Sequence, residues 1–153
     1  MRTLELKIPP PAVAVLIAGA MWGIFLVLPL LELPAFIRVA TAVIVALAGF
    51  GFSIAGVISF RRARTTVNPL KPETTSSLVC SGIYRVTRNP MYVGLLFVLI
   101  AWAVFLSSAW TLLGPLVFVF YMNRFQIAPE ERVLSGMFGA DYTAYKSRVR
   151  RWL

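Results

Sequence analysis

Long apolar stretches separated by short polar breaks dominate the pattern of this chain. Residues 12–31 carry no charge, and residues 35–60 carry only Arg38, near their start. About 20 helical residues, at 1.5 Å each, cross a bilayer core of about 30 Å. Residues 91–123 are uncharged but too long for one crossing, and Ser107–Ser108 lies in their middle. The pattern predicts an all-α, integral membrane four-helix bundle with spans at 12–31, 35–60, 91–106 and 109–123.

Two groups of small residues predict where these helices pack. Gly19 and Gly23 form a small-xxx-small pair in the first span, which either permits close helix approach or is incidental. The second half of the second span is richer in small residues. Because small side chains let backbones approach in lipid, this belt predicts the seat of another helix. Its members are Gly49, Gly51, Ser53, Ala55 and Gly56.

Polar segments follow the second and fourth spans. The linker 61–90 contains a turn-rich part at 65–79, which is either an irregular surface connector or a flap over a ligand. The tail 124–153 has helical signals, so we expect it to form a helical cap on the cytosolic end of the bundle. These two polar segments and the four spans make one membrane domain of residues 1–153.

The tail itself predicts two helices. Pro129 and the two glutamates after it are typical of a helix start, and Gly136 or Gly139 is a candidate end. Asp141 can open the second helix. An aromatic face at helical spacing then follows, which suits an amphipathic interfacial helix or a lid. The face consists of Tyr142, Tyr145, Val149 and Trp152.

Composition and charge agree with a membrane location. Hydrophobic residues make up 59% of the chain and charged residues 14%, unlike a soluble domain. The net charge of +9 comes from basic residues that flank the apolar stretches, mainly in the linker and the tail. With four spans, the positive-inside rule predicts that both termini are cytoplasmic. We expect a multi-pass protein of a bacterial or archaeal inner membrane. The basic residues then face anionic lipid headgroups rather than nucleic acid.

Three further features limit the chemistry and the processing of the chain. It contains no His, which excludes a His-based metal site and a His base, and we expect no metal centre. Cys80 is the only Cys, so an intramolecular disulfide is excluded, and it is read as an inert small residue. The first apolar run is too long for the h-region of a signal peptide, so we expect a retained span.

Both polar segments should face the same compartment and combine their side chains there. Cations suit a carboxylate or phosphate, acids suit an amine, and aromatic rings suit a flat ring or a cationic centre. This set predicts a zwitterionic ligand that carries an aromatic base. The linker supplies Tyr84, Arg85, Arg88, Asn89 and Tyr92, and the tail supplies Arg124, Gln126, Glu130, Glu131, Tyr142, Tyr145 and Arg148.

Three blocks in the second half of the chain follow a recognisable spacing. They are Gly82-Ile-Tyr84 with Arg88-Asn89-Pro90-Met91-Tyr92-Val93-Gly94, then Glu130-Glu131-Arg-Val-Leu134, then Phe138-Gly139 with Tyr142, Tyr145 and Val149-Arg150. They resemble the isoprenylcysteine carboxyl methyltransferase family, which belongs with the phospholipid methyltransferases. The familiar pattern is G-x-Y…R-H-P-x-Y-x-G, then E-E-x-x-L, then F-G-x-x-Y-x-x-Y. The resemblance covers about half of the chain, and the first two spans match only in being apolar.

The resemblance implies methyl transfer from S-adenosylmethionine to a lipophilic or lipid acceptor at the membrane–cytosol boundary. It implies a cofactor site between the linker motif and the tail, and an arginine near the acceptor. Glu131 and Arg148 are the implied catalytic residues. The implied cofactor-binding residues are Tyr84, Arg88, Asn89, Pro90, Tyr92, Gly94, Glu130, Glu131, Tyr142 and Tyr145.

One position departs from the family pattern, because Asn89 stands where the family has His. Asn keeps a hydrogen-bond donor and an acceptor but does not titrate near neutral pH. Asn89 can therefore replace a binding His but not a base. Two alternatives to a methyltransferase stay open. One is a non-enzymatic membrane scaffold, and the other is an NADPH-dependent membrane reductase, since sterol reductases resemble the same hairpin and cofactor region.

Overall fold

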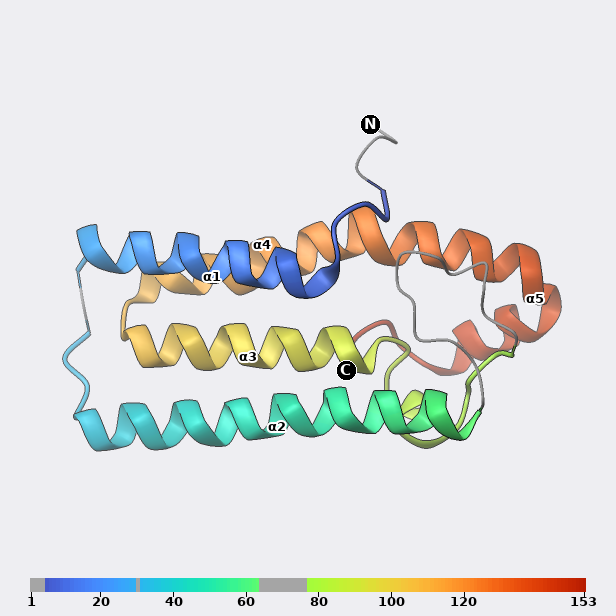
Figure 1. Ribbon diagram of the computed structural model, residues 1–153, viewed down its shortest axis with the longest axis horizontal. Coiled ribbons are helices and arrows are strands. Elements are labelled where there is room, and N and C mark those ends of the chain that lie inside the picture. Colours follow the sequence, from blue (N-terminus) through green and yellow to red (C-terminus); the bar gives the residue numbers. More distant parts are fainter. Residues whose placement is uncertain (1–4, 30, 64–76) are drawn as a thin grey trace.

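The apolar helices of this chain lie side by side in a bundle. The computed structural model describes residues 5–29, 31–63 and 77–153. Helix α3 packs against α1, α2 and α4, and α1 also packs against α4 (Figure 1). Throughout the described residues the regular structure is helical, with one isolated bridge between Thr87 and Arg150. The bounds are α1 Pro10–Val27, α2 Ala35–Arg62, η3 Gly82–Arg85, α3 Pro90–Leu106, η4 Ala109–Leu112, α4 Leu113–Tyr121, η5 Met122–Ile127 and α5 Ala128–Arg148.

The belt of small residues in α2 seats α3, as predicted. A Cβ added to Gly94 of α3 would lie 2.0 Å from Ser53 Oγ and 2.6 Å from the Gly49 carbonyl oxygen. Gly56 faces the start of α3, where an added Cβ would lie 3.2 Å from Pro90 Cγ. The two backbones therefore approach as closely as small-residue interfaces in lipid allow. Gly51 lies outside this contact.

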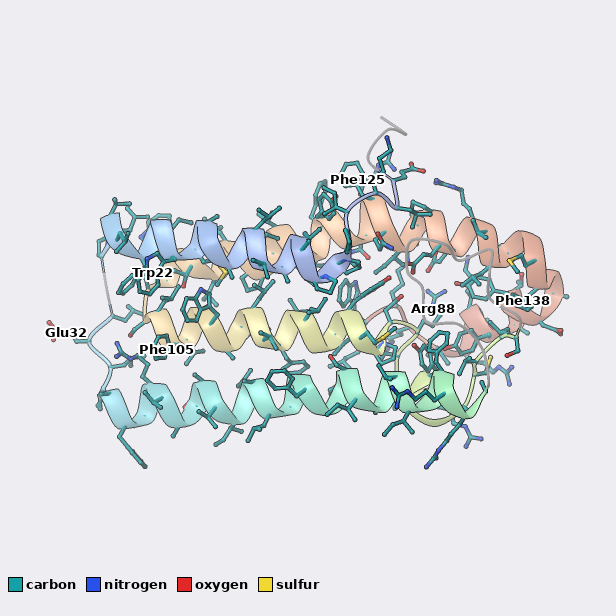
Figure 2. All side chains as sticks on the ribbon, viewed as in Figure 1. Trp22, Glu32, Arg88, Phe105, Phe125 and Phe138 are labelled. Atoms are coloured by element: carbon teal, nitrogen blue, oxygen red, sulfur yellow. The ribbon has the colours of Figure 1, made fainter. Side chains whose placement is uncertain are left out.

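The long uncharged run splits at the predicted place. Ser107 has a φ of 54°, in the left-handed region, and ends α3. Its hydroxyl donates to the Leu31 carbonyl oxygen at 2.8 Å, and the Ser108 hydroxyl donates to the Pro29 carbonyl oxygen at 2.9 Å. These bonds tie the α3–η4 turn to the connection between α1 and α2. Both turns thus lie at the end of the bundle marked by Glu32, opposite Arg88 (Figure 2).

An aromatic column crosses the bundle near that end. The Trp22 and Trp102 rings stack at 5.9 Å between centroids, and Trp102 stacks on Phe105 at 5.4 Å. The Trp102 indole N–H donates to the Ala18 carbonyl oxygen at 3.1 Å. Trp22 lies on α1 and Phe105 on α3, both toward the end of the bundle marked by Glu32 (Figure 2). The Gly19–Gly23 pair does not seat a helix, since an added Cβ at either glycine would meet nothing within 4 Å in the described chain.

Helix α5 begins at Ala128 with Pro129, Glu130 and Glu131 in its first turn, as predicted, but it is not separated from the helix before it. Helix α4 continues through the π-helical turn η5 directly into α5. Pro129 has no N–H, so it cannot bond the Phe125 carbonyl four residues earlier. The Leu6 backbone N–H donates to that carbonyl oxygen instead, at 3.1 Å. The carbonyl that Pro129 cannot bond therefore has a partner in the N-terminal segment.

Helix α5 turns back toward the bundle at Gly139, one of the two predicted ends. Gly139 has φ 48° and ψ −117°, a conformation that a residue with a side chain rarely adopts. The returning part ends at Arg148, and Val149 is extended. Val149 and Trp152 therefore do not continue the predicted aromatic helix face. The chain instead runs back to the bundle mouth, between α3 and α5 (Figure 1).

The outer surface of the bundle is apolar. Helices α1 and α2 are long and apolar enough to cross a membrane, and α3 is apolar but shorter. Large hydrophobic side chains are exposed along α1, α2 and α4, among them Leu16, Phe36, Ile44, Leu116 and Phe120. Crossing by four helices, the orientation of the termini and the single membrane domain stay predictions. The connector or flap expected at 65–79 lies almost wholly outside the described residues.

Candidate functional site

The site lies at the bundle end marked by Arg88, where the segment before α3 meets α5 (Figure 2). The short helix η3 brings in Tyr84, whose ring packs edge-on against Phe60 at 5.3 Å. Its approach needs a glycine, because Gly82 has a φ of 62° and an added Cβ would lie 2.8 Å from Ser59 Oγ. The Tyr84 carbonyl oxygen accepts a hydrogen bond from the Tyr145 hydroxyl at 2.7 Å. The linker motif and the tail are therefore in direct contact.

Glu131 lies between two arginines. Arg88 Nη1 is 3.1 Å from Glu131 Oε1. Arg151 donates from Nε to Oε1 at 2.8 Å and from Nη2 to Oε2 at 2.7 Å, a two-point contact. Burial raises the pKa of the Glu131 carboxyl, but the bond from Arg151 and the charges of Arg88 and Arg151 outweigh it and hold the pKa below its ordinary value. Glu131 is thus ionised, and the three side chains together carry one positive charge.

The Glu130 carboxyl is surrounded by neutral hydrogen-bond donors, whereas Glu131 is surrounded by cations. Its Oε1 accepts hydrogen bonds from the Tyr92 hydroxyl at 2.5 Å and from Gln126 Nε2 at 2.7 Å. Burial raises the pKa of Glu130 to about 7, the two hydrogen bonds oppose this, and the Glu131 charge adds to the rise. Adjacent carboxyl groups with separated pKa values are typical of functional sites. Here Glu131 supplies a fixed negative charge and Glu130 can exchange a proton near neutral pH.

The returning part of α5 places two tyrosines over this pair. The Tyr142 and Tyr145 rings lie 6.3 Å apart, and Lys146 Nζ lies 5.7 Å from the centre of the Tyr142 ring. Burial, then the Glu131 charge, raise the pKa of Tyr142 to about 12. Burial likewise raises the pKa of Tyr145. Both phenols are therefore neutral at physiological pH, and both residues are buried in this structure.

Arg88 has donors left over. Its Nε and Nη1 are buried and make no hydrogen bond within the described part of the chain, because the contact with Glu131 is an ion pair without hydrogen-bond geometry. Buried donors are normally satisfied, so two such atoms on a cation are candidate donors to an anionic ligand. Anionic oxygens, as in a carboxylate or a phosphate, are the strongest acceptors for such guanidinium donors.

The structure therefore brings together most of the predicted site residues. Asn89 lies in the same place, but its amide donates to the Arg151 carbonyl oxygen. Pro90 is buried at the start of α3, against Gly56. Those that meet through direct contacts or shared electrostatics are Tyr84, Arg88, Tyr92, Glu130, Glu131, Tyr142 and Tyr145.

Other candidates lie apart from this cluster. Gly94 belongs to the α2–α3 contact. Arg148 is exposed, and its Nε donates to the Ala144 carbonyl oxygen of its own helix at 3.1 Å. Arg124 lies 3.3 Å from Glu5, which also pairs with Arg132. Arg124 and Arg132 therefore contact the N-terminal segment rather than the Arg88–Glu131 pair.

Arg151 is the site residue that the motifs missed. A helical continuation of α5 would place it off the aromatic face, among solvated basic residues. The chain is extended there instead, and this turns Arg151 onto Glu131. The sequence contains two hints. The third motif block ends at Arg150, directly before Arg151, and the Arg-Arg-Trp run at 150–152 combines basic and aromatic residues, which also fits an interfacial anchor.

The described part of the chain is helical, and two of its helices are long and apolar enough to cross a membrane. The sequence profile of the family described as Phospholipid methyltransferase matches residues 37–141, more than half of the chain, and the chain belongs to this family. This confirms the resemblance found in the motifs. No solved structure matches the chain.

Individual relatives give the same picture. An uncharacterized protein of Haemophilus influenzae is 46% identical over 63 residues, covering 41% of this chain and 100% of that protein. The Protein-S-isoprenylcysteine O-methyltransferase of Saccharomyces cerevisiae is 34% identical over 85 residues, covering 52% of this chain and 33% of that protein. Protein-S-isoprenylcysteine O-methyltransferase B of Arabidopsis thaliana is 29% identical over 93 residues, covering 61% of this chain and 47% of that protein. The chain thus matches less than half the length of each of these two enzymes.

Proposed function

We propose that this protein transfers a methyl group from S-adenosylmethionine to a lipophilic acceptor at the membrane surface. The observation that carries the proposal is the Arg88–Glu131 contact at 3.1 Å, which joins the linker motif to the tail motif of the family. Two relatives are named as O-methyltransferases that act on isoprenylcysteine. The chain matches them only in part, so the acceptor class here is lipophilic without further definition.

The chemistry of the side chains fits the cofactor. Arg88 offers buried donors without partners in the described chain to a carboxylate. Glu130 is a buried acid with a proton-exchanging carboxyl group, which suits an ammonium group or hydroxyls. Tyr142 and Tyr145, which are buried in this structure, are the aromatic rings of the site that an adenine ring would contact. A zwitterionic ligand with a flat base therefore finds a matching group for each of its parts.

The protein's task in such a reaction is mainly one of placement. When bound, S-adenosylmethionine supplies a methyl group that its sulfonium already activates for displacement. The side chains at the bundle mouth hold the donor, keep water away and fix the direction from which an acceptor approaches. Arg148 is proposed to lie near the acceptor rather than to bind the donor.

The apolar outer surface supports a lipophilic acceptor. Exposed hydrophobic side chains along α1, α2 and α4 continue toward the end of the bundle that carries the site. A lipid-soluble molecule can therefore reach the site laterally, while a charged donor reaches it from the aqueous side. We propose that this aqueous side is the cytoplasm, because the basic linker and tail lie there by the positive-inside rule.

Binding of the donor tests the proposal most directly. We expect calorimetry on the detergent-purified chain to give micromolar-range affinity for S-adenosylmethionine and for S-adenosylhomocysteine, the demethylated product, with NADPH unable to compete. Membranes incubated with methyl-labelled donor should then yield a labelled lipophilic product by mass spectrometry. Competition by NADPH would favour the reductase. Absence of heat, thermal shift and label would favour the scaffold and reject the methyltransferase.

A further inference from the structure

After α5 the chain forms a returning strap, residues 149–152, that inserts beside the start of α3. Thr87 pairs with Arg150 in a parallel bridge, and the Arg88 backbone N–H donates to the Arg150 carbonyl oxygen at 2.9 Å. The Trp152 indole N–H donates to Asn123 Oδ1 at 3.1 Å, in the π-helical turn η5. The strap therefore connects the linker motif to η5 across the mouth of the bundle.

Two side chains of the linker hold a single carbonyl of this strap. Thr87 Oγ1 donates to the Arg151 carbonyl oxygen at 3.0 Å, and Asn89 Nδ2 donates to the same oxygen at 2.9 Å. Thr87 is fully buried. Thr87 Oγ1 in turn accepts a hydrogen bond from the Asn89 backbone N–H at 3.2 Å. Fixing this carbonyl fixes the Arg151 backbone, from which the guanidinium reaches Glu131.

The direction of the Asn89 side chain is informative. Asn89 is the N-cap residue of α3, and Asn is among the residues that best satisfy the free N–H groups at a helix start. Within the described chain its side chain makes no such capping bond. The amide group is directed at the strap instead. The Asn89 side chain therefore contacts the C-terminal strap and does not stabilise the start of α3 by capping it.

We propose that Asn89 is a positioning residue for the methyl-transfer site, an inference that rests on the proposed function. Asn89, with Thr87, holds the strap so that Arg151 stays on Glu131, and Glu131 in turn orients Arg88. This role needs one N–H donor and no titration. It accounts for Asn at a position where the family has His, since both side chains supply that donor.

Amide hydrogen exchange of the full chain in detergent tests the contact without reference to activity. The Arg88 amide donates to the strap, so its exchange reports whether the strap is seated. We expect Asn89→Ala to speed exchange at Arg88 about tenfold, which corresponds to about 1.4 kcal/mol of lost protection. We expect Asn89→His to restore it. Ser147→Ala, whose hydroxyl bonds only its own helix at Ala144, should leave it unchanged.

Affinity for S-adenosylhomocysteine tests the link to the site. Asn89→Ala and Arg151→Ala should each weaken binding about tenfold, and the double variant should bind no worse than Arg151→Ala alone, because both changes break one chain of contacts. Additive losses with unchanged exchange at Arg88 would make Asn89 a direct ligand and overturn the inference. If the unmutated chain binds no S-adenosylhomocysteine, the proposed function fails, while unchanged exchange in Asn89→Ala would by itself reject the strap contact.

Discussion

Arg88 Nη1 lies 3.1 Å from Glu131 Oε1, although one residue precedes α3 and the other follows the π-helical turn η5. From Arg88 the chain runs through α3 to the far end of the bundle and comes back through α4 to Glu131. The contact therefore joins the two ends of this hairpin at one end of the bundle. Arg151 approaches the same carboxylate from the other side. Arg88 and Arg151 thus hold the Glu131 carboxylate in a fixed position. Glu131 is therefore a structural ion-pair partner as well as a candidate ligand for the methyl donor.

Glu131→Gln should weaken the binding of S-adenosylhomocysteine by about tenfold or more while the protein still extracts from membranes in a folded state. The amide cannot neutralise two guanidinium groups, so Arg88 and Arg151 would repel each other and lose their common orientation. Calorimetry measures the affinity, and gel filtration the folded fraction. Glu5→Gln is a matched control, because Glu5 also pairs with two arginines, Arg124 and Arg132, away from the site. Equal losses in both variants would contradict the site assignment.

Gly94→Ala should destabilise the protein through the bundle rather than through the site. The new methyl group would overlap Ser53 Oγ and the Gly49 carbonyl oxygen, both within 2.6 Å of the added Cβ, and the cost of such overpacking is about 1–3 kcal/mol. The thermal midpoint in detergent measures the effect. Gly51→Ala, on α2 but clear of contacts in the described chain, should leave the midpoint unchanged or raise it. If Gly94→Ala has an unchanged thermal midpoint but no longer binds the methyl donor, Gly94 belongs to the cofactor site instead.

Apolar length and small residues predicted the bundle well, because those features act locally. The span starting at residue 35, the break at Ser107 and the seat formed by Gly49 and Gly56 each follow from a few neighbouring residues. The tail was harder. The helix passes Pro129 without a break, and the Phe125 carbonyl oxygen, which Pro129 cannot bond, accepts from the distant Leu6 N–H. A pattern within the tail contains no sign of that distant partner.

The site shows the same division. The motifs predicted the meeting of Arg88 with Glu131, since both belong to blocks of fixed spacing. They missed Arg151, because its position depends on an extended strap that Thr87 and Asn89 hold in place. They also could not separate Glu130 from its neighbour, since the two glutamates are equivalent in sequence and differ only in which side chains surround them.

Arg148→Ala should reduce turnover more than donor affinity. Arg148 is exposed and bonds the carbonyl of Ala144, apart from the Arg88–Glu131 pair, so its removal leaves the donor's proposed contacts intact. Single-turnover rates with a lipophilic acceptor, beside calorimetry with S-adenosylhomocysteine, separate the two effects. Lys146→Ala, which removes a neighbouring cation from the face of Tyr142, is the comparison. Unchanged turnover in Arg148→Ala would remove this residue from the proposed reaction.

Glu130 should make the stability of the protein fall as the pH rises from 5 to 8. Burial raises the pKa of Glu130 in the folded protein to about 7, against 4.5 for the ordinary carboxyl. Between these values the folded protein keeps a proton that the unfolded chain has lost. The free energy of unfolding therefore decreases across this window, by roughly 3 kcal/mol for a shift of this size. The stabilisation is complete below the unfolded pKa and is lost as the pH passes the folded pKa.

Glu130→Gln should abolish that slope. The amide oxygen can still accept from Tyr92 and Gln126, and the side chain no longer titrates, so thermal midpoints measured in detergent at pH 5, 6, 7 and 8 should stay level and exceed the unmutated protein at pH 8. The chain contains no His, so no imidazole titrates between pH 5 and 8. Glu131 has a lowered pKa, so its stabilising effect is lost only as the pH falls through a value below 4.5, and Glu131→Gln should keep the downward slope. Parallel curves for the unmutated protein and Glu130→Gln would show that Glu130 is already ionised at pH 5, as an exposed carboxyl would be.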